Sequence, residues 1–353
     1  MSALARKRVS LSQSTGSWQQ AMRDSVTDVD TLCDLLGLSD ALRNSARRAV
    51  PLFGLRVPRG YIGRMRHADP DDPLLRQVLP LDAENALTPG YVFDAVGDRA
   101  SSLGDGVLHK YHGRALLVTT GACAVHCRYC FRRHFDYADD HAGADQGRVA
   151  LAHVAADASI QEVILSGGDP LSLSNARLEA LGKAIDEIPH VTRLRLHTRT
   201  AVVLPERIDE GLLDWLSTRR QRCVVVVHVN HPAEINADVA AALADLRQAG
   251  ALLLNQAVLL RGVNDDADVL VDLSERLFES NVMPYYLHML DRVAGAAHFQ
   301  VDDTRAQQLI DTLAARLPGY LVPRLARETP GEQAKQVLGH RAVDSCTEFG
   351  ETH

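Results

Sequence analysis

The chain has 353 residues, of which 46% are hydrophobic and 24% are charged. This composition is ordinary for a globular enzyme. The formal net charge is −7 and the Lys and Arg residues are dispersed, which excludes the basic stripe of a nucleic-acid-binding protein. No apolar run approaches the roughly 20 residues that span a bilayer, and residues 1–16 lack the apolar stretch of a secretory signal. We therefore expect a cytoplasmic protein that acts on a small molecule and binds neither nucleic acid nor membrane.

Helical patterns occupy the first hundred residues. Residues 17–55 carry apolar side chains at helical spacing. Residues 67–81 are rich in Pro and Asp, which is the composition of a loop or linker. We therefore predict a mainly helical N-terminal region over residues 1–106.

From residue 107 onward, short apolar runs alternate with helical patterns. This alternation is typical of a parallel sheet with helical crossovers, and such barrels place their chemistry at the carboxyl ends of the strands. We predict an α/β fold with a partial (β/α)6 barrel over residues 107–317. A short C-terminal segment, 318–353, contains one more apolar run at 320–325. The predicted strands are 115–119, 162–166, 193–198, 224–230, 252–258 and 283–290, and the predicted helices are 175–188, 210–218, 233–249 and 266–279.

Three of the six cysteines lie within eight residues, at Cys123, Cys127 and Cys130. Clustered thiols in a cytosolic chain indicate a metal site rather than a disulfide framework. Thiolates are the natural ligands of iron–sulfur clusters, and three of them on a four-iron cluster leave one iron open. Zinc is the main alternative, because His126 or His134 would complete a tetrahedral site. Three buried, unligated cysteines are the remaining interpretation.

The CxxxCxxC spacing, with Tyr129 before the third cysteine, resembles the radical S-adenosylmethionine (AdoMet) superfamily. The resemblance implies a barrel of the radical AdoMet kind and a [4Fe-4S] cluster whose open iron binds AdoMet. An external electron donor would then generate an adenosyl radical. Gly167, Gly168 and Asp169 look like the glycine-rich AdoMet segment of that superfamily, since glycines let a ligand approach the backbone. Gly-Gly-Asp-Pro is also a common turn, which is the structural alternative.

A narrower resemblance covers residues 91–335. Several segments match the lysine 2,3-aminomutase family in order and spacing. This resemblance implies pyridoxal phosphate as a further cofactor and the conversion of L-lysine into β-lysine by radical migration of the amino group from carbon 2 to carbon 3. The matching segments are 110–114, 123–133, 166–171, 228–232, 255–265 and 284–298.

The family resemblance implies roles for individual residues. Lys335, the only lysine after Lys183, matches the lysine that binds pyridoxal phosphate covalently. Arg132 matches the residue that binds the substrate carboxylate, which a planar guanidinium suits. Asp291 and Glu328 match the acidic groups that bind the distal amino group of lysine. The remaining matches are the pyridoxal phosphate contacts Lys110, Tyr111, Arg114 and Gln256, and the AdoMet contact His228.

Each of these assignments has an ordinary structural alternative. Arg132 would only balance the charge of the cluster, and Lys335 would be a solvated tail lysine. Asp291 and Glu328 would be surface carboxylates, and His228 would be a core histidine. The match around Lys335 is imperfect, because one glycine precedes this lysine where the long aminomutases have a run of glycines.

The chain length and the segments 17–38 and 323–328 are closer to the short bacterial branch of the family than to the long one. That branch makes β-lysine for attachment to translation elongation factor P by a separate lysyl ligase. The alternatives are a 2,3-aminomutase for glutamate or another amino acid, a stand-alone β-lysine producer, and a non-catalytic iron–sulfur or zinc protein. The sequence is compatible with a homo-oligomer.

Overall fold

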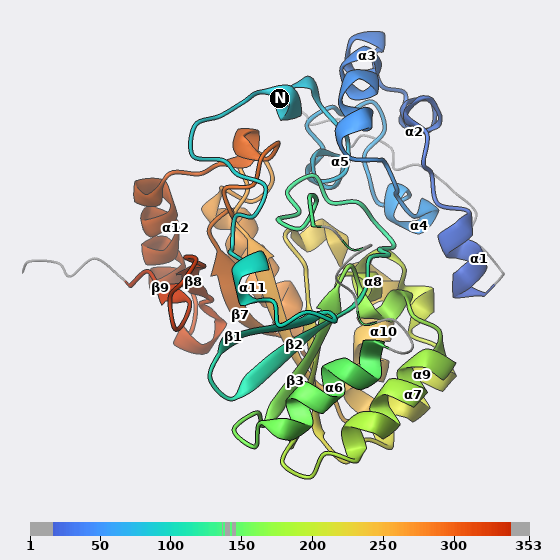
Figure 1. Cartoon of the computed structure of the whole chain (residues 1–353). Coiled ribbons are helices and arrows are strands. Elements are labelled where there is room, and N and C mark those ends of the chain that lie inside the picture. The colour runs from blue at the N-terminus through green and yellow to red at the C-terminus, as the bar shows by residue number, and fades with distance from the viewer. Residues whose placement is uncertain (1–16, 136, 138–141, 143–145, 340–353) are drawn as a thin grey trace, which may run out of the picture.

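The computed structural model describes residues 17–135, 137, 142 and 146–339 (Figure 1). The predictions for residues 1–16 and 340–353 lie outside the described residues. One sheet forms the centre, and its strands follow one another in sequence order from β1 to β9. Strands β2 to β8 run parallel, and β1 and β9 pair antiparallel at the two edges. The strands are β1 (Val107–Tyr111), β2 (Arg114–Thr120), β3 (Glu162–Gly167), β4 (Arg193–Thr198), β5 (Arg222–Val227), β6 (Leu252–Val258), β7 (Met283–His288), β8 (Arg324–Arg327) and β9 (Gln336–Val337).

The sheet confirms the predicted α/β class and the partial barrel. All six predicted strands are present as β2 to β7, each within a few residues of its predicted limits. The apolar run at 320–325 leads into β8, which extends the parallel sheet by one strand. The edge strand β1 was not predicted, because its residues, VLHKY, carry only two apolar side chains before the polar end.

Crossover helices connect the parallel strands, as predicted. The largest difference in a boundary is at the helix expected from residue 233, which begins at Ala237. Residues Pro232–Glu234 form a separate 3-10 turn, and Asn236 then caps the helix by accepting from the backbone N–H of Val239. The helices are α6 (Gln146–Ala156), α7 (Asn175–Asp186), α8 (Thr200–Val203), α9 (Glu210–Ser217), α10 (Ala237–Gln248), α11 (Ala267–Glu279) and α12 (Asp303–Arg316).

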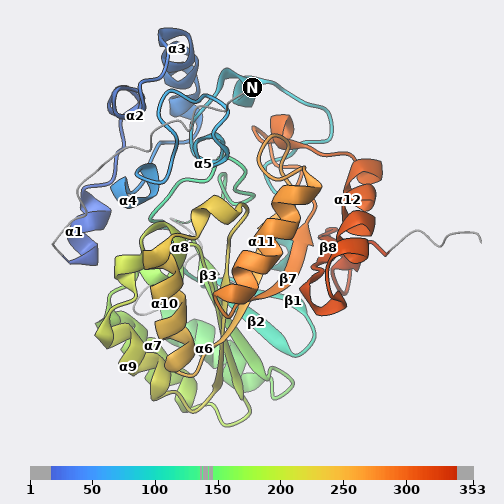
Figure 2. The same ribbon diagram turned by 180° about the vertical axis from the view of Figure 1, so that it is seen from behind.

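The N-terminal helices gather at one end of the sheet in both views (Figures 1 and 2). The stretch 67–81, predicted to be loop, contains the short helix α5. This helix forms because Pro73 occupies its first turn and Asp72 accepts from the backbone N–H of Leu74 and of Leu75. In the part of the chain that the structure describes, no helix is both long and apolar enough to cross a membrane. The helices are α1 (Trp18–Arg23), α2 (Val29–Leu36), α3 (Asp40–Ala49), α4 (Arg59–Ile62) and α5 (Pro73–Arg76).

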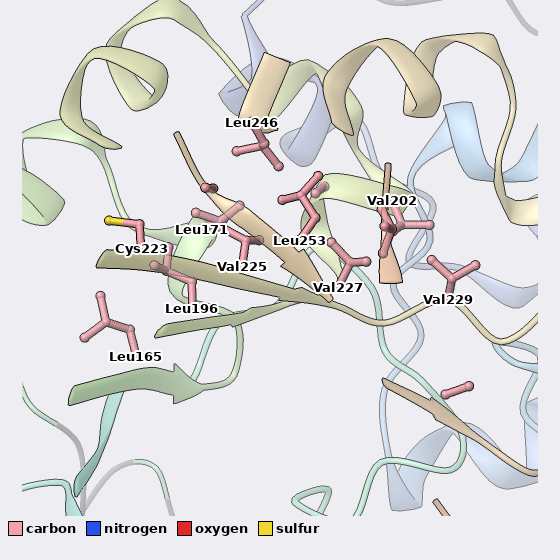
Figure 3. Close-up of a cluster of buried hydrophobic side chains, with 14 of the residues drawn as sticks. Leu165, Leu171, Leu196, Val202, Cys223, Val225, Val227, Val229, Leu246 and Leu253 are labelled. Atoms are coloured by element: carbon pink, nitrogen blue, oxygen red, sulfur yellow. The ribbon is translucent and has the colours of Figure 1, made fainter. Parts of the chain in front are cut away.

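The two faces of the sheet have different side chains because neighbouring residues of a strand point to opposite faces. One register row crosses four strands and belongs to the main hydrophobic core, together with Leu246 of α10 (Figure 3). Residues next to that row in the sequence line a cavity on the other face. The core row is Leu165, Leu196, Val225 and Leu253. The cavity residues are Ile164, Ser166, Arg195 and His197.

A second hydrophobic core joins the N-terminal helices to the barrel. Leu32, Tyr61 and Leu74 are fully buried in it, and they share it with Ala124 and Val125, which lie between the first two clustered cysteines. The N-terminal region therefore packs directly against the cysteine loop and restrains its position.

Candidate active site

A cavity of about 370 Å³ lies on the inner face of the sheet. Strand residues near the carboxyl ends of β3, β4, β6 and β7 contribute to its wall, as expected for a barrel of this kind. Every residue that the sequence predicts for the site lines this single cavity. These residues are Cys123, Cys127, Cys130, Gly167, Gly168, Asp169, Lys110, Tyr111, Arg114, Gln256, His228, Arg132, Asp291, Glu328 and Lys335.

The cysteine loop follows β2 and is held by the N-terminal region. All three of its cysteines are free thiols. The backbone N–H of His126 donates to the carbonyl of Arg56 at 3.0 Å, and that of Arg128 donates to the carbonyl of Gln77 at 2.9 Å. These bonds leave the thiols of Cys123 and Cys127 at the cavity wall.

A buried ion cluster supports the same loop. Glu84 accepts from Arg128 Nη2 and from Arg133 Nη2, both at 2.6 Å, and it also accepts from Arg128 Nε at 2.8 Å. The side chains of Glu84 and Arg128 are completely buried. Both guanidinium groups lie over the ring of Phe53. Removing the single anion would leave two buried cations unpaired, so this cluster is essential to the local structure.

The two histidines of the zinc alternative lie away from the cavity. His126 Nδ1 donates to the carbonyl of Gly54 at 2.9 Å, and its ring stacks on Phe53. His134 Nε2 bonds to the carbonyl of Ala294 at 3.1 Å. Within residues 17–135, 137, 142 and 146–339, no three Cys, His, Asp or Glu side chains converge on a single-ion site. Neither histidine therefore lies with the three cysteines at the cavity wall, where it would have to lie to complete a zinc site.

The Gly-Gly-Asp-Pro segment packs against the start of the cysteine loop. The backbone N–H of Gly168 donates to the carbonyl of Thr120 at 2.6 Å, and that of Asp169 donates to the carbonyl of Ala122 at 2.8 Å. A Cβ at Gly168 would lie 2.4 Å from the Ala122 oxygen. Gly167 adopts φ +116°, which other residues rarely adopt. Both glycines are therefore required for this close backbone contact.

The Asp169 carboxylate accepts hydrogen bonds from neighbouring groups of the protein. It accepts from the Thr198 hydroxyl at 2.8 Å and from the backbone N–H groups of Leu171, Arg199 and Thr200 at 3.0, 2.7 and 2.9 Å. Burial raises its pKa, and these hydrogen bonds oppose that rise. Asp169 thus ties the turn after β3 to the end of β4.

A chain of alternating charges crosses the cavity. Arg132 Nε donates to Asp98 at 2.7 Å, and Lys110 Nζ lies 2.7 Å from the other oxygen of Asp98. Lys110 also donates to Glu328 at 3.1 Å, and Lys335 Nζ binds the second oxygen of Glu328. The substrate-carboxylate residue and the cofactor lysine predicted from the sequence are therefore connected through two acidic side chains.

The two predicted acidic residues differ in protonation. Burial opposes ionisation of Glu328, but attraction to Lys335 and Lys110 outweighs it and lowers the pKa of Glu328 to about 2. Burial raises the pKa of Asp291 to about 7, and the negative charge of Glu328 contributes to the rise. Neither residue is a solvated surface carboxylate: Glu328 is charged at neutral pH, and Asp291 gains its negative charge as the pH rises through about 7.

Histidine side chains form another part of the wall. Gln256 Nε2 donates to His228 Nε2 at 2.8 Å, and the ring centroids of His197 and His228 are 6.1 Å apart. Burial lowers the pKa of His228 and of His288 to about 3 and lowers the pKa of His197 well below its usual range. All three rings are neutral at pH 7.

Several cavity residues were not identified from the sequence. Arg199 follows β4, a position at the carboxyl end of a strand that could have drawn attention. Asp98 lies in an irregular segment without any pattern. Arg195 pairs with Glu162 at 2.6 Å. In the sequence it is one of several polar residues that alternate with apolar ones along β4, so it does not stand out. The aromatic pair Tyr285 and Tyr286 lies in β7.

Comparison with known proteins places these features in a family. Residues 104–200 match the family described as a 4Fe-4S single cluster domain. The chain is 47% identical to the L-lysine 2,3-aminomutase of Escherichia coli over 91% of this chain and 94% of that protein. Its identity to the enzyme of the same name from Haemophilus influenzae is 42%, over 90% of this chain and 94% of that protein. A radical SAM methyltransferase structure from Sphaerobacter thermophilus aligns with 63% of this chain and 68% of that chain, with a TM-score of 0.46 and 17% identity.

The L-lysine 2,3-aminomutase of Clostridium subterminale is 31% identical over 90% of this chain but only 76% of its own length. The higher identity and fuller coverage of the Escherichia coli and Haemophilus influenzae proteins confirm the predicted resemblance to the short bacterial branch. The match extends over the barrel and the cysteine loop alike, so the chain belongs to the L-lysine 2,3-aminomutase family.

Proposed function

We propose that this protein is an isomerase that converts L-lysine into β-lysine with a [4Fe-4S] cluster, AdoMet and pyridoxal phosphate. The observation that carries the proposal is that Lys335 and the three clustered cysteines line one cavity. A radical formed at the cluster could therefore reach a substrate bound beside Lys335. The names of the relatives from Escherichia coli and Haemophilus influenzae support the same activity.

The residues of the cavity fit these groups. Cys123, Cys127 and Cys130 would hold the cluster, and Lys335 would hold pyridoxal phosphate. The Arg114 guanidinium lies 4.6 Å from the ring centroid of Tyr111 and would meet the phosphate as a cation. When bound, the cluster with AdoMet supplies a carbon radical, and pyridoxal phosphate supplies the π-system on which nitrogen migrates.

The hydrogen bonds of the cavity refine three of the sequence-based roles. Lys110 is already paired with two carboxylates, so we propose that it orders Asp98 and Glu328 rather than binding phosphate. Gln256 would fix the orientation of the His228 ring beside AdoMet. Gly168, together with Gly167, would hold the AdoMet-binding turn close to the cysteine loop.

Arg132 would bind the substrate carboxylate. Its Nε is directed by Asp98 and its Nη1 donates to the Ser166 hydroxyl at 3.1 Å. Two of its three nitrogens are thus fixed by the protein. A guanidinium held in this way can receive a carboxylate without reorienting.

Asp291 and Glu328 would bind the distal ammonium group of lysine. Two carboxylates at this position attract a cation and repel the side-chain carboxylate of glutamate. The charges of these two side chains therefore support lysine rather than glutamate as the substrate. Neutral His197, His228 and His288 add no competing cation to the wall.

The test is the reaction itself. The protein would be reconstituted anaerobically with iron and sulfide, supplied with L-lysine, AdoMet, pyridoxal phosphate and a low-potential reductant, and its products resolved by chiral chromatography. We expect β-lysine from the unaltered chain and none from Cys127→Ala or Lys335→Ala. Cluster formation without β-lysine would favour a non-catalytic iron–sulfur protein, and conversion of glutamate instead of lysine would favour the other amino-acid specificity.

We further propose that the β-lysine is used to modify translation elongation factor P through a separate lysyl ligase. The likeness to the short bacterial relatives supports this role. Deleting the gene should remove the mass of one β-lysyl group from the factor, and adding β-lysine to the medium should restore it. An unchanged mass in the deletion strain would separate this role from the isomerase activity.

A further inference from the structure

We infer that Arg199 sets the reduction potential of the cluster by donating a hydrogen bond to the thiolate of Cys127. The inference rests on the proposed function, because it requires that Cys127 ligate the cluster. Arg199 Nη1 lies 3.1 Å from Cys127 Sγ. It is a positioning residue, since it acts through the cysteine and not on the substrate.

Arg199 is held in place by side chains from two regions of the fold. Its Nη2 donates to Gln77 Oε1 at 2.7 Å and to Glu234 Oε2 at 3.0 Å. Its guanidinium carbon lies 5.4 Å from the ring centroid of Tyr129. The Arg199 side chain is only 6% exposed and that of Glu234 is completely buried. A charge held so rigidly beside one sulfur cannot be replaced by water when the cluster changes oxidation state.

The third nitrogen of the guanidinium, Nε, lacks a hydrogen-bond acceptor from the described residues. Arg199 Nε is buried and has no hydrogen-bond partner among the described residues. Buried donors are nearly always satisfied in native proteins. The sulfur atoms of a cluster bound at Cys127 are acceptors that the chain itself does not provide.

The sign of the effect follows from charge. Reduction adds one electron to the cluster, and the added negative charge spreads over its sulfur atoms. A cation that donates to a ligand sulfur stabilises the reduced form more than the oxidised form, especially in a buried site. Arg199 therefore raises the reduction potential, and Glu234 limits the rise because it partly neutralises Arg199.

The experiment is a potentiometric titration followed by electron paramagnetic resonance on the full chain, reconstituted anaerobically with iron and sulfide and reduced stepwise with dithionite. Arg199→Met removes both the charge and the donors at similar length. We expect the equilibrium constant for one-electron reduction to fall about tenfold, which is 59 mV toward more negative potential. Arg199→Lys, which keeps the charge, should recover part of this loss.

Glu234→Gln provides a test of opposite sign. It removes the anion that partly neutralises Arg199, while its amide oxygen still accepts from the backbone N–H of Asn230 and of His231. We expect its cluster to be reduced at less negative potential than in the unaltered chain. Damage to the fold would not move the two variants in opposite directions, and this readout stands even if Arg199→Met fails to fold.

Arg219→Met is the matched control. The Arg219 side chain is equally buried, at 5% exposure, and pairs with Asp186 at 2.9 Å, but it does not line the cavity. The reduction potential of the cluster in Arg219→Met should equal that in the unaltered chain. The inference is overturned if Arg199→Met keeps the original potential with full iron content, or if Glu234→Gln leaves the potential unchanged or lowers it. If the unaltered chain forms no cluster, the proposed function fails instead.

Discussion

Glu328 binds Lys335 through one carboxylate oxygen and Lys110 through the other. The two lysines approach from distant parts of the sequence, β1 and the C-terminal segment, and the same carboxylate is the predicted partner of the substrate ammonium. Any substrate cation must therefore compete with two resident lysines, and conversion of Lys335 to its cofactor-bound form would release one oxygen for the substrate.

Glu328→Gln tests this arrangement. Loss of the negative charge removes a charge-assisted hydrogen bond to the distal ammonium, so we expect KM for lysine to rise about 10- to 100-fold. Steady-state kinetics measure the change. Glu332→Gln is the control, because Glu332 is exposed in the same segment and should leave KM unaltered. An equal KM for the two variants would show that Glu328 does not contact the substrate.

Asp291 gives the site a dependence on pH. Its pKa of about 7 means that it is neutral below pH 7 and charged above it. Only the charged form attracts an ammonium, so KM for lysine should fall as pH rises through about 7, by up to roughly tenfold per unit on the acidic side. Asp291→Asn should abolish this inflection. A KM that rises with pH over the same interval would assign the opposite charge to the group that binds the substrate.

Glu84 should be essential to stability. It is the single anion between buried Arg128 and Arg133, so Glu84→Gln leaves two cations unpaired and should lower the free energy of unfolding by about 3–5 kcal/mol. Denaturant unfolding measures the change. Glu279→Gln breaks an exposed pair with Arg276 and should cost less than about 0.5 kcal/mol. Similar losses in both variants would contradict the role of the buried cluster.

Gly168→Ala should disturb the cysteine loop. The new Cβ would lie 2.4 Å from the Ala122 oxygen and 2.7 Å from the Gly121 carbonyl carbon, both backbone atoms, so the loop must move. We expect reduced iron and sulfide content after reconstitution. Gly319→Ala is the control, because no atom lies within 4 Å of its added Cβ. Full iron content in Gly168→Ala would mean that the loop tolerates the displacement.

The sequence was most informative where chemistry and local pattern coincide. The cysteine spacing and the six alternating strands are local features, and the structure contains both. Lys335 could be singled out because lysine is rare in the C-terminal half of the chain. Its ion pair with Glu328 could not be predicted from spacing, because it depends on β8 and β9 forming an antiparallel pair that brings position 335 back over position 328.

Interactions between distant segments were not accessible from the sequence. Asp98 pairs with Arg132 and Lys110 because the irregular segment before β1 brings it to the cavity wall. Arg199 reaches Cys127 because β4 ends beside the cysteine loop, across 72 positions of the chain. Neither side chain belongs to a periodic pattern, and each was recognised only from its contacts.

The most direct test of the shared cavity is an isotope transfer. L-lysine deuterated at carbon 3 would be turned over by the fully loaded protein, and the recovered AdoMet would be examined by mass spectrometry. If a radical formed at a cluster on Cys123, Cys127 and Cys130 acts on lysine bound beside Lys335, deuterium should appear in AdoMet. Lys335→Ala should then abolish the transfer. Formation of β-lysine with no deuterium in AdoMet would contradict a common site for the cluster and Lys335.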